Sequence, residues 1–139
     1  MAAKDLYHNI VIEALQKDGW IITDDPFTIT FGSRDVFVDI GAEKTTIGAS
    51  KAGHQLAIEI KSFINQSAIT DLHRAIGQFV MYEVLLDELK ITREVYVAVP
   101  KNSYDGIFSE EIGQLMIRRQ KIKLLIFDVE TASIVQWIH

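Results

Sequence analysis

Three side chains near the middle of the chain have the types and the spacing that metal-dependent phosphoryl chemistry needs. Glu59 and Lys61 stand two residues apart in LAIEIKSF, and Asp39 stands near the end of VFVDIG. Residues two apart on a strand share one face, so Glu59 and Lys61 are expected to point the same way. If the two segments pair as neighbouring strands, all three side chains meet at one end of a sheet. Carboxylates are hard oxygen ligands for Mg²⁺, and a lysine can orient water or stabilise charge on a phosphoryl group.

The alternation along both segments predicts which residues lie opposite these charges. The apolar set predicted to lie opposite Glu59 is Leu56, Ile58 and Ile60. Asp39 is expected on one face with Phe37 and Asp35, opposite Val36, Val38 and Ile40. The alternative is an ordinary ion pair on an exposed strand, worth about 0–1 kcal/mol. A second E-x-K triplet, Glu88 to Lys90, shows that the motif alone is weak. Charges placed between apolar residues of a strand are costly unless they are used, which favours the metal site.

A second constellation lies on the helix predicted over residues 67–89. Gln78 and Tyr82 are i and i+4, with Arg74 one turn earlier and Asp71 close to the same face. Spacing alone favours a solvated side of this helix. The alternative is a helix face that lines a cleft.

Other charged residues give weaker indications. Glu13 borders the apolar stripe of the first predicted helix and could reach the sheet as a third acidic ligand, or pair with Lys17 at i+4. The four histidines are scattered, and no pair has metal-ligand spacing. The basic run over 118–123 complements the dipole at a helix end, and a phosphate-contacting patch is the alternative.

The elements that must position these residues follow from apolar periodicity and from turn residues. Helices are predicted over 4–17, 67–89 and 108–120, with Ser67 as an N-cap. Strands are predicted over 20–23, 27–31, 36–40, 55–63, 95–99, 123–129 and 133–138, with a glycine-spaced loop over 41–53. The last two strands read as a hairpin around 130–132. This order predicts an α/β fold in which helices cover both faces of one sheet.

Length and composition exclude several classes of protein. The chain has 139 residues, which predicts a single domain over 1–139, and it has no cysteine, which excludes disulfide scaffolds and thiol chemistry. Charge interrupts the first ten residues, so no signal peptide is expected, and no apolar run is long enough to cross a membrane. We therefore expect a cytoplasmic protein without membrane contact. The net charge of −5 disfavours DNA binding by bulk electrostatics, so any such role depends on a local site.

Four blocks in this order resemble a known family: VFVDIGAEK, LAIEIKSF, ITDLHRAIGQFVMYE and VYVAVP. The chain resembles the XisH family, the excision-controlling factors of the fdxN DNA element in nitrogen-fixing cyanobacteria, over essentially its whole length. The resemblance implies the restriction-endonuclease-like fold of the PD-(D/E)xK superfamily. That fold has an αβββαβ core, with a central mixed sheet flanked by helices, and here a C-terminal helix and β-hairpin follow it.

The resemblance also implies roles for the central residues. Asp39 matches the motif aspartate, Glu59 the (D/E) position and Lys61 the motif lysine. Asp39, Glu59 and the backbone carbonyl of Ile60 would bind Mg²⁺ or Mn²⁺, and Lys61 would position the attacking water. Val38 replaces the proline of "PD", a position that ligates nothing.

Three further residues and the partners follow from the same resemblance. Glu13 matches a first-helix glutamate, a third metal ligand in many of these nucleases. Gln78 and Tyr82 match a Q-x-x-x-Y motif that orders the site or contacts DNA. Family members act with a second small factor, XisI, and with the element recombinase. Nucleases of this fold that cut duplexes often pair, so a homodimer is also an expectation.

Three functions stay open from the sequence. The first is a Mg²⁺- or Mn²⁺-dependent endonuclease in site-specific excision of a DNA element, which the Asp/Glu/Lys set favours. The second is a non-catalytic control factor that uses the nuclease scaffold to bind DNA, XisI or the recombinase, which the acidic balance favours. The third is an interaction domain without any DNA role, in which these charges are surface pairs.

Overall fold

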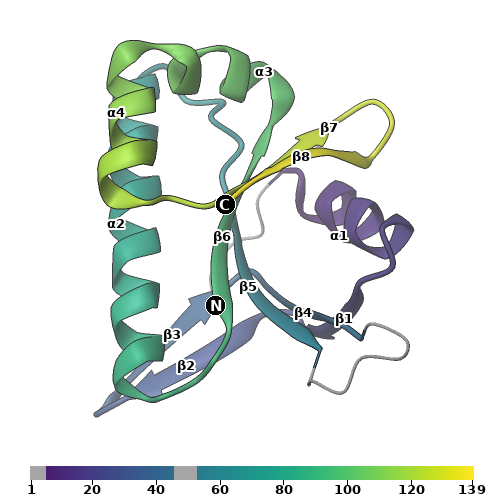
Figure 1. The fold of residues 1–139 in the computed structure, drawn as a ribbon, viewed down its shortest axis with the longest axis vertical. Coiled ribbons are helices and arrows are strands. Elements are labelled where there is room, and N and C mark those ends of the chain that lie inside the picture. The colour runs from purple at the N-terminus through teal and green to yellow at the C-terminus, as the bar shows by residue number, and fades with distance from the viewer. Residues whose placement is uncertain (1–5, 46–52) are drawn as a thin grey trace.

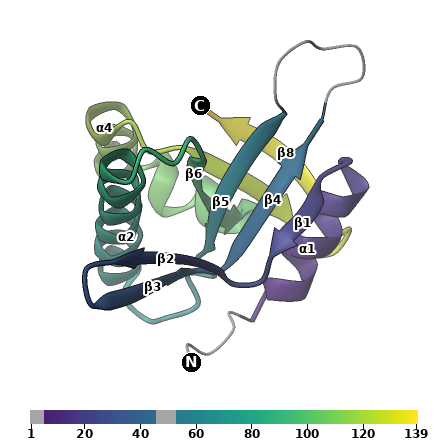
Figure 2. The same ribbon diagram turned by 90° about the horizontal axis from the view of Figure 1, so that it is seen from below.

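Six strands of the chain form one mixed sheet through the centre of the molecule (Figures 1 and 2). The computed structural model describes residues 6–45 and 53–139. In sheet order the strands are β1 (Ile21–Asp24), β4 (Ile40–Lys44), β5 (His54–Ile60), β6 (Glu94–Pro100), β7 (Leu124–Asp128) and β8 (Ser133–Ile138). The strands β5, β6 and β7 are parallel to one another, whereas β1–β4, β4–β5 and β7–β8 pair antiparallel.

Helices cover both faces of this sheet. Helix α1 (His8–Lys17) lies on one face, and α2 (Ala68–Glu88) lies on the other with α4 (Glu111–Gln120) beside it (Figures 1 and 2). A short helix, α3 (Lys101–Asp105), and the 3₁₀ turn η1 (Ile107–Ser109) connect β6 to α4. Strands β2 (Phe27–Phe31) and β3 (Arg34–Val38) pair in a separate two-stranded sheet that contacts α2.

The order of elements agrees with the fold class expected from the sequence. The series α1, β1, β4, β5, α2 and β6 is the predicted αβββαβ core, and the predicted C-terminal helix and hairpin follow as α4 and β7–β8. The β2–β3 ribbon is inserted between the first and second strands of this core. The α/β architecture with a central mixed sheet flanked by helices is therefore confirmed.

Two apolar layers hold the helices against the sheet. The layer under α1 contains Val11, Leu15, Ile40, Leu56, Ile58, Ile60 and Phe127. The layer under α2 contains Val38, Ala57, Leu72, Phe79, Leu86, Val97 and Leu124. Successive residues of β5 thus enter opposite layers, which is the period-2 alternation that the sequence predicts for this strand. Burial of these side chains is the main force that fixes the strand carrying Glu59.

The predicted strand over 36–40 is wrong, because the chain changes sheets within it. Strand β3 ends at Val38, Asp39 forms a bend, and β4 begins at Ile40. Val38 packs in the layer under α2, whereas Ile40 packs in the layer under α1. The two residues therefore do not share a face, contrary to the alternation expected from the sequence. The bend leaves Asp39 between the two sheets.

Other boundaries differ from the prediction by a few residues. Ser67 is the N-cap of α2, and its Oγ accepts a hydrogen bond from the Thr70 amide at 3.2 Å, as predicted. The predicted helix over 108–120 begins only at Glu111, after η1, and Gly113 allows α4 to approach the carbonyl oxygen of Ile107 closely. The first helix begins at His8 rather than at residue 4, and residues 4 and 5 lie outside the described residues. The first part of the predicted loop over 41–53 is β4, and residues 46–52 lie outside the described part.

Both edge strands of the central sheet are irregular. The pairing of β1 with β4 shifts register between Ile22 and Asp24. The pairing of β7 with β8 shifts register between Ile126 and Phe127. Along residues 6–45 and 53–139, no helix combines the length and the apolar character that crossing a membrane requires.

Candidate active site

Asp39 and Glu59 come together where β4 begins and β5 ends. The antiparallel pairing of these strands sets Ile40 opposite Ile58, so the strands are neighbours as the sequence analysis required. The amide of Ile60 donates a hydrogen bond to Asp39 Oδ2 at 2.8 Å. The amide of Asp39 donates to Glu59 Oε1 at 3.4 Å. The Ile60 amide therefore holds the Asp39 carboxylate, and the Asp39 amide holds the Glu59 carboxylate.

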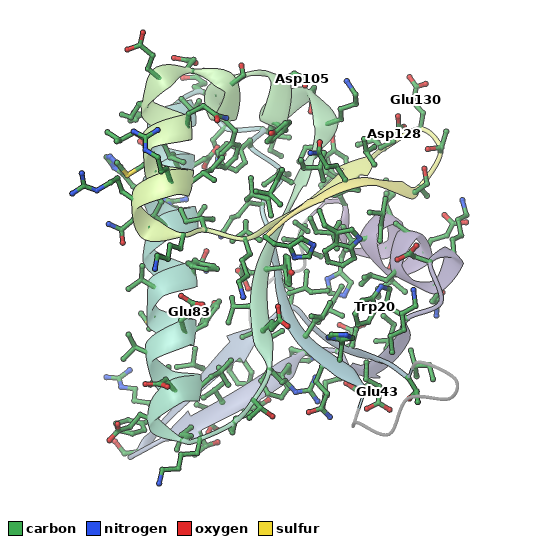
Figure 3. The ribbon with its side chains drawn as sticks, viewed as in Figure 1. Trp20, Glu43, Glu83, Asp105, Asp128 and Glu130 are labelled. Atoms are coloured by element: carbon green, nitrogen blue, oxygen red, sulfur yellow. The ribbon has the colours of Figure 1, made fainter. Side chains whose placement is uncertain are left out.

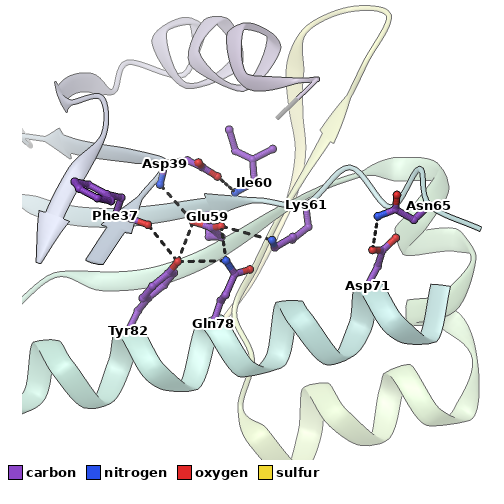
Figure 4. A network of polar contacts seen from close by, with 9 residues as sticks. All are labelled: Phe37, Asp39, Glu59, Ile60, Lys61, Asn65, Asp71, Gln78 and Tyr82. Atoms are coloured by element: carbon purple, nitrogen blue, oxygen red, sulfur yellow. Dashed lines mark hydrogen bonds and ion pairs between the residues drawn. The ribbon is translucent and has the colours of Figure 1, made fainter. Parts of the chain in front are cut away.

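Lys61 follows Glu59 on the same face of the chain (Figure 4). Its Nζ lies 3.6 Å from Glu59 Oε2, and its side chain is 21% exposed. The amide of Lys61 donates to the carbonyl oxygen of Ala98 on β6 at 2.9 Å, so the backbone stays paired beyond the end of β5. The Lys61 side chain is thus anchored at its base and is partly exposed to solvent.

Helix α2 supplies two further polar groups from the other side (Figure 4). Gln78 Nε2 donates to Glu59 Oε2 at 3.0 Å and lies 3.4 Å from the Tyr82 hydroxyl. The Tyr82 hydroxyl has two acceptors for its proton, Glu59 Oε1 at 3.4 Å and the carbonyl oxygen of Phe37 at 3.3 Å. Tyr82 is buried. The solvated helix side that spacing alone favoured is therefore wrong for these two residues, which point at Glu59.

Burial dominates the electrostatics of Glu59. Desolvation raises the pKa of its carboxyl from the ordinary 4.5 to about 7, and the charge of Asp39 adds to the rise. The charge of Lys61 and the hydrogen bonds from Asp39 and Tyr82 lower this pKa, but less strongly. Burial and the charge of Glu59 also raise the pKa of the Tyr82 hydroxyl, which therefore stays protonated. Glu59 accordingly exchanges a proton near neutral pH, where an isolated glutamate would be fully ionised.

The donor atoms of this network fit a hard divalent cation. Asp39 and Glu59 offer carboxylate oxygens, which Mg²⁺ prefers, and a cation between them would relieve the repulsion that raises the Glu59 pKa. Gln78 Oε1 is buried and has no hydrogen-bond partner among the described residues, so the network keeps one unused acceptor. For Ile60 the structure shows a contact of the amide with Asp39, and its carbonyl stays a proposed ligand.

Glu13 lies elsewhere. Its side chain is exposed on α1, and its Oε1 is 4.0 Å from Lys17 Nζ, which is the i+4 pairing that the sequence offered as the alternative. Within residues 6–45 and 53–139, no three acidic or histidine side chains form a group able to hold a metal ion. The structure therefore supplies an acidic pair rather than an acidic triad.

One polar residue near the site was not assigned correctly from the sequence. Asp71, which the spacing placed near a solvated face, is buried, and its Oδ1 accepts from Asn65 Nδ2 at 2.8 Å (Figure 4). Arg74, one turn later, is exposed, as the solvated helix side predicted from spacing requires. Asp71 therefore ties the start of α2 to the segment that follows Lys61.

A buried histidine was also missed. His8 is buried at the start of α1, with Nε2 2.8 Å from Asp25 Oδ1. The signal was present in the chain, because His8, Val11 and Leu15 have helical spacing and so share the buried face of α1.

Comparison with known proteins decides the family. A model of the XisH protein family matches residues 1–135. The chain belongs to the XisH family. It is 40% identical to an XisH family protein from Nostoc punctiforme PCC 73102, whose crystal structure superposes on this chain with a TM-score of 0.85. The alignment covers 97% of this chain and 100% of that protein. It is 39% identical to an fdxN element excision controlling factor protein from Anabaena variabilis, with a TM-score of 0.87 and coverage of 98% of this chain and 100% of that one. No curated protein matches the chain.

Proposed function

We propose that this XisH protein is a Mg²⁺- or Mn²⁺-dependent phosphodiesterase that cleaves DNA during the site-specific excision of a DNA element. One observation carries the proposal. A buried glutamate, Glu59, is held next to Asp39 and Lys61 at the end of two central strands, although burial of its charge costs stability. Charges arranged in this way are typical of sites with a chemical task. The link to excision rests on the name of the Anabaena variabilis relative.

Each residue of the central set has a separate task in this proposal. Asp39 and Glu59, with the Ile60 carbonyl, would hold the cation, which when bound would activate water and neutralise charge on the phosphate. Lys61 orients the attacking water and stabilises the negative charge that develops on the phosphoryl oxygens. The half-buried position of Lys61 suits this task, because its side chain is partly exposed while its backbone is fixed in the sheet.

Gln78 and Tyr82 are positioning residues. Both contact Glu59 through contacts of 3.0 to 3.4 Å, and both come from one face of α2. They fix the orientation of the Glu59 carboxylate relative to Asp39.

A second candidate function is that of a control factor without turnover, which binds DNA, XisI or the recombinase. One feature of the structure favours it. Asp105, Asp128 and Glu130 lie beyond the carboxyl ends of β6 and β7 (Figure 3), farther along the strand direction than Glu59, which is level with Val97 and Leu124. Lys101 pairs with Asp105 at 2.7 Å, which leaves a net negative charge on this group. That charge repels DNA phosphates, so a partner that supplies cations would be needed for DNA contact there.

Metal binding is the experiment that tests the proposed site without knowledge of the DNA substrate. Calorimetry with Mn²⁺ should show micromolar to millimolar binding to the wild type, and the Glu59→Gln variant should lose it. Glu88→Gln is the matched control, because Glu88 belongs to the other E-x-K triplet of the chain and is exposed. Absent binding, or binding unchanged by Glu59→Gln, would contradict the metal site and leave the control factor as the better proposal.

Cleavage separates the two candidate functions once metal binding is established. DNA containing the ends of an excised element, with Mn²⁺ and with XisI and recombinase added, should be cut by the wild type. Lys61→Ala should bind Mn²⁺ and remain folded, yet cut more slowly by at least about 100-fold. Lys90→Ala, in the second triplet, should cut at the wild-type rate. Cleavage retained by Lys61→Ala would exclude the role assigned to this lysine.

A further inference from the structure

Helix α4 presents an apolar strip to the solvent. Ile112 is 43% exposed and Leu115 is 37% exposed, whereas the adjoining side of the helix packs into the protein through Gly113, Met116 and Ile117. An open hollow of about 630 Å³ lies along the exposed side, lined by Ser109, Glu111, Ile112, Gln114, Leu115 and Arg118. Helix α4 is therefore apolar on two sides, and only one of them is covered by the rest of the chain.

The charges at the two ends of α4 are of opposite sign. Glu110 and Glu111 stand at its start, and Arg118 and Arg119 stand in its last turn. All four are exposed, and none of them forms an ion pair within residues 6–45 and 53–139. The arrangement complements the dipole of α4 itself. It also makes the helix complementary to an antiparallel copy of itself.

We propose that a second copy of this chain docks on this strip, with the two α4 helices antiparallel about a twofold axis near Leu115. Such an axis sets Leu115 against its own counterpart and Ile112 against the aliphatic stem of Arg119 of the second copy. Glu111 of each copy then lies beside Arg118 of the other, because these two residues share one flank of the helix. The apolar strip is covered and both charge pairs are formed by a single symmetric contact.

The size of the contact predicts its strength. A helix of ten residues is about 15 Å long, so α4 alone covers less than the roughly 800 Å² per partner of a standard interface. The dimer should therefore be weak, with a Kd in the micromolar range or above. None of the residues of the candidate active site lies on α4, so the dimer can form whether or not the protein cleaves DNA.

Charge reversal tests the twofold arrangement directly. Sedimentation velocity from 5 to 500 µM, at low salt, should show a concentration-dependent dimer for the wild type, which high salt weakens. Glu111→Arg alone and Arg118→Glu alone should each be monomeric, because each sets like charges beside one another. An equimolar mixture of the two variants should again form dimers, because both cross-pairs are then of opposite sign. A mixture that stays monomeric while the wild type dimerises would overturn the antiparallel pairing.

An apolar pair of variants tests the strip itself. Leu115→Asp should abolish the dimer while the protomer stays folded by circular dichroism, because Leu115 is 37% exposed at the surface of α4. Val84→Asp is the matched control, since Val84 is an exposed apolar residue of α2 and is 61% exposed. Equal loss of the dimer in both variants, or a wild type that is monomeric at every concentration, would overturn the proposal.

Discussion

The two faces of the central sheet bury polar groups in different ways. On the side of α1, the buried polar residue is His8, which has one close partner at 2.8 Å, Asp25, beside a layer that is otherwise apolar. On the side of α2, Glu59 is surrounded by Asp39, Gln78, Tyr82 and Lys61 at distances from 3.0 to 3.6 Å. Figure 3 shows both sides, with Trp20 toward α1 and Glu83 on α2.

The difference separates stability from function. A single short contact pairs Nε2 of His8, and its buried Nδ1 has no hydrogen-bond partner among the described residues. Several longer contacts leave the charge of Glu59 only partly compensated, as the rise of its pKa to about 7 shows. The α1 face therefore resembles an ordinary core, whereas the α2 face retains a group that the fold alone would not favour. Variants on the two faces should respond in opposite ways.

The largest expected effect lies on the α1 face. Ile58 is fully buried there, so Ile58→Ala should lower the free energy of unfolding by about 3 kcal/mol through lost burial and the cavity that remains. Lys61→Ala, on the other face and partly exposed, should change it by less than about 1 kcal/mol. Urea unfolding measures both. Similar losses for the two variants would remove the contrast between the faces.

The next largest effect is a gain in stability on the α2 face, where replacement of Glu59 should raise the free energy of unfolding to a degree that depends on pH. The pKa of Glu59 is about 7 in the folded protein and 4.5 in the unfolded chain. Between these two pH values the folded protein keeps a proton on Glu59 that the unfolded chain has already lost. Stability should therefore fall as pH rises through this window, by up to roughly 3 kcal/mol. Glu59→Gln keeps the shape of the side chain but removes the charge, so it should be more stable than the wild type by about 2 kcal/mol at pH 8 and nearly equal to it at pH 4.5.

Urea unfolding in EDTA at several pH values measures this difference. Glu88→Gln is the control for the loss of an exposed glutamate and should track the wild type throughout. A constant offset between Glu59→Gln and the wild type, independent of pH, would contradict the buried charge as its cause.

The smallest effect concerns the hydroxyl that contacts Glu59. Tyr82→Phe removes contacts of 3.3 and 3.4 Å, which should lower the free energy of unfolding by less than about 1 kcal/mol. Because the Tyr82 hydroxyl lowers the pKa of Glu59, this pKa should move further upward in the variant. A carbon-13 NMR titration of the Glu59 carboxyl measures the shift. Tyr96→Phe, whose hydroxyl contacts His139 and Glu94, should leave the Glu59 titration unchanged.

The parts of the fold that follow local periodicity could be predicted from the sequence. The alternation around Glu59 gave β5 and its two faces, and the apolar stripe with Ser67 gave α2 to within a residue at each end. The break at Asp39 could not be predicted in this way, because no glycine or proline marks it. Val38 and Ile40 are equally apolar, and only the presence of two layers explains why each enters a different one.

The candidate site could be predicted only in part, for a related reason. Spacing showed that Gln78 and Tyr82 are neighbours on a helix, but not that this side of α2 faces Glu59. The direction in which a helix face points depends on how the helix packs, which is a tertiary property. Glu13 illustrates the reverse error, because a plausible residue type on the right helix lies on its exposed side. Its pairing with Lys17 needed only local spacing.

The irregular edges of the sheet bear on aggregation. An exposed edge strand with an unbroken row of amide and carbonyl groups can recruit the strand of another chain. Here β1 has only four residues, and both edge pairings shift register, at Ile22/Asp24 and at Ile126/Phe127. Such shifts twist an edge and interrupt its row of hydrogen-bonding groups. Growth of the sheet by addition of a strand from another chain is thereby disfavoured. A partner that binds at these edges would have to recognise side chains rather than unpaired backbone amide and carbonyl groups.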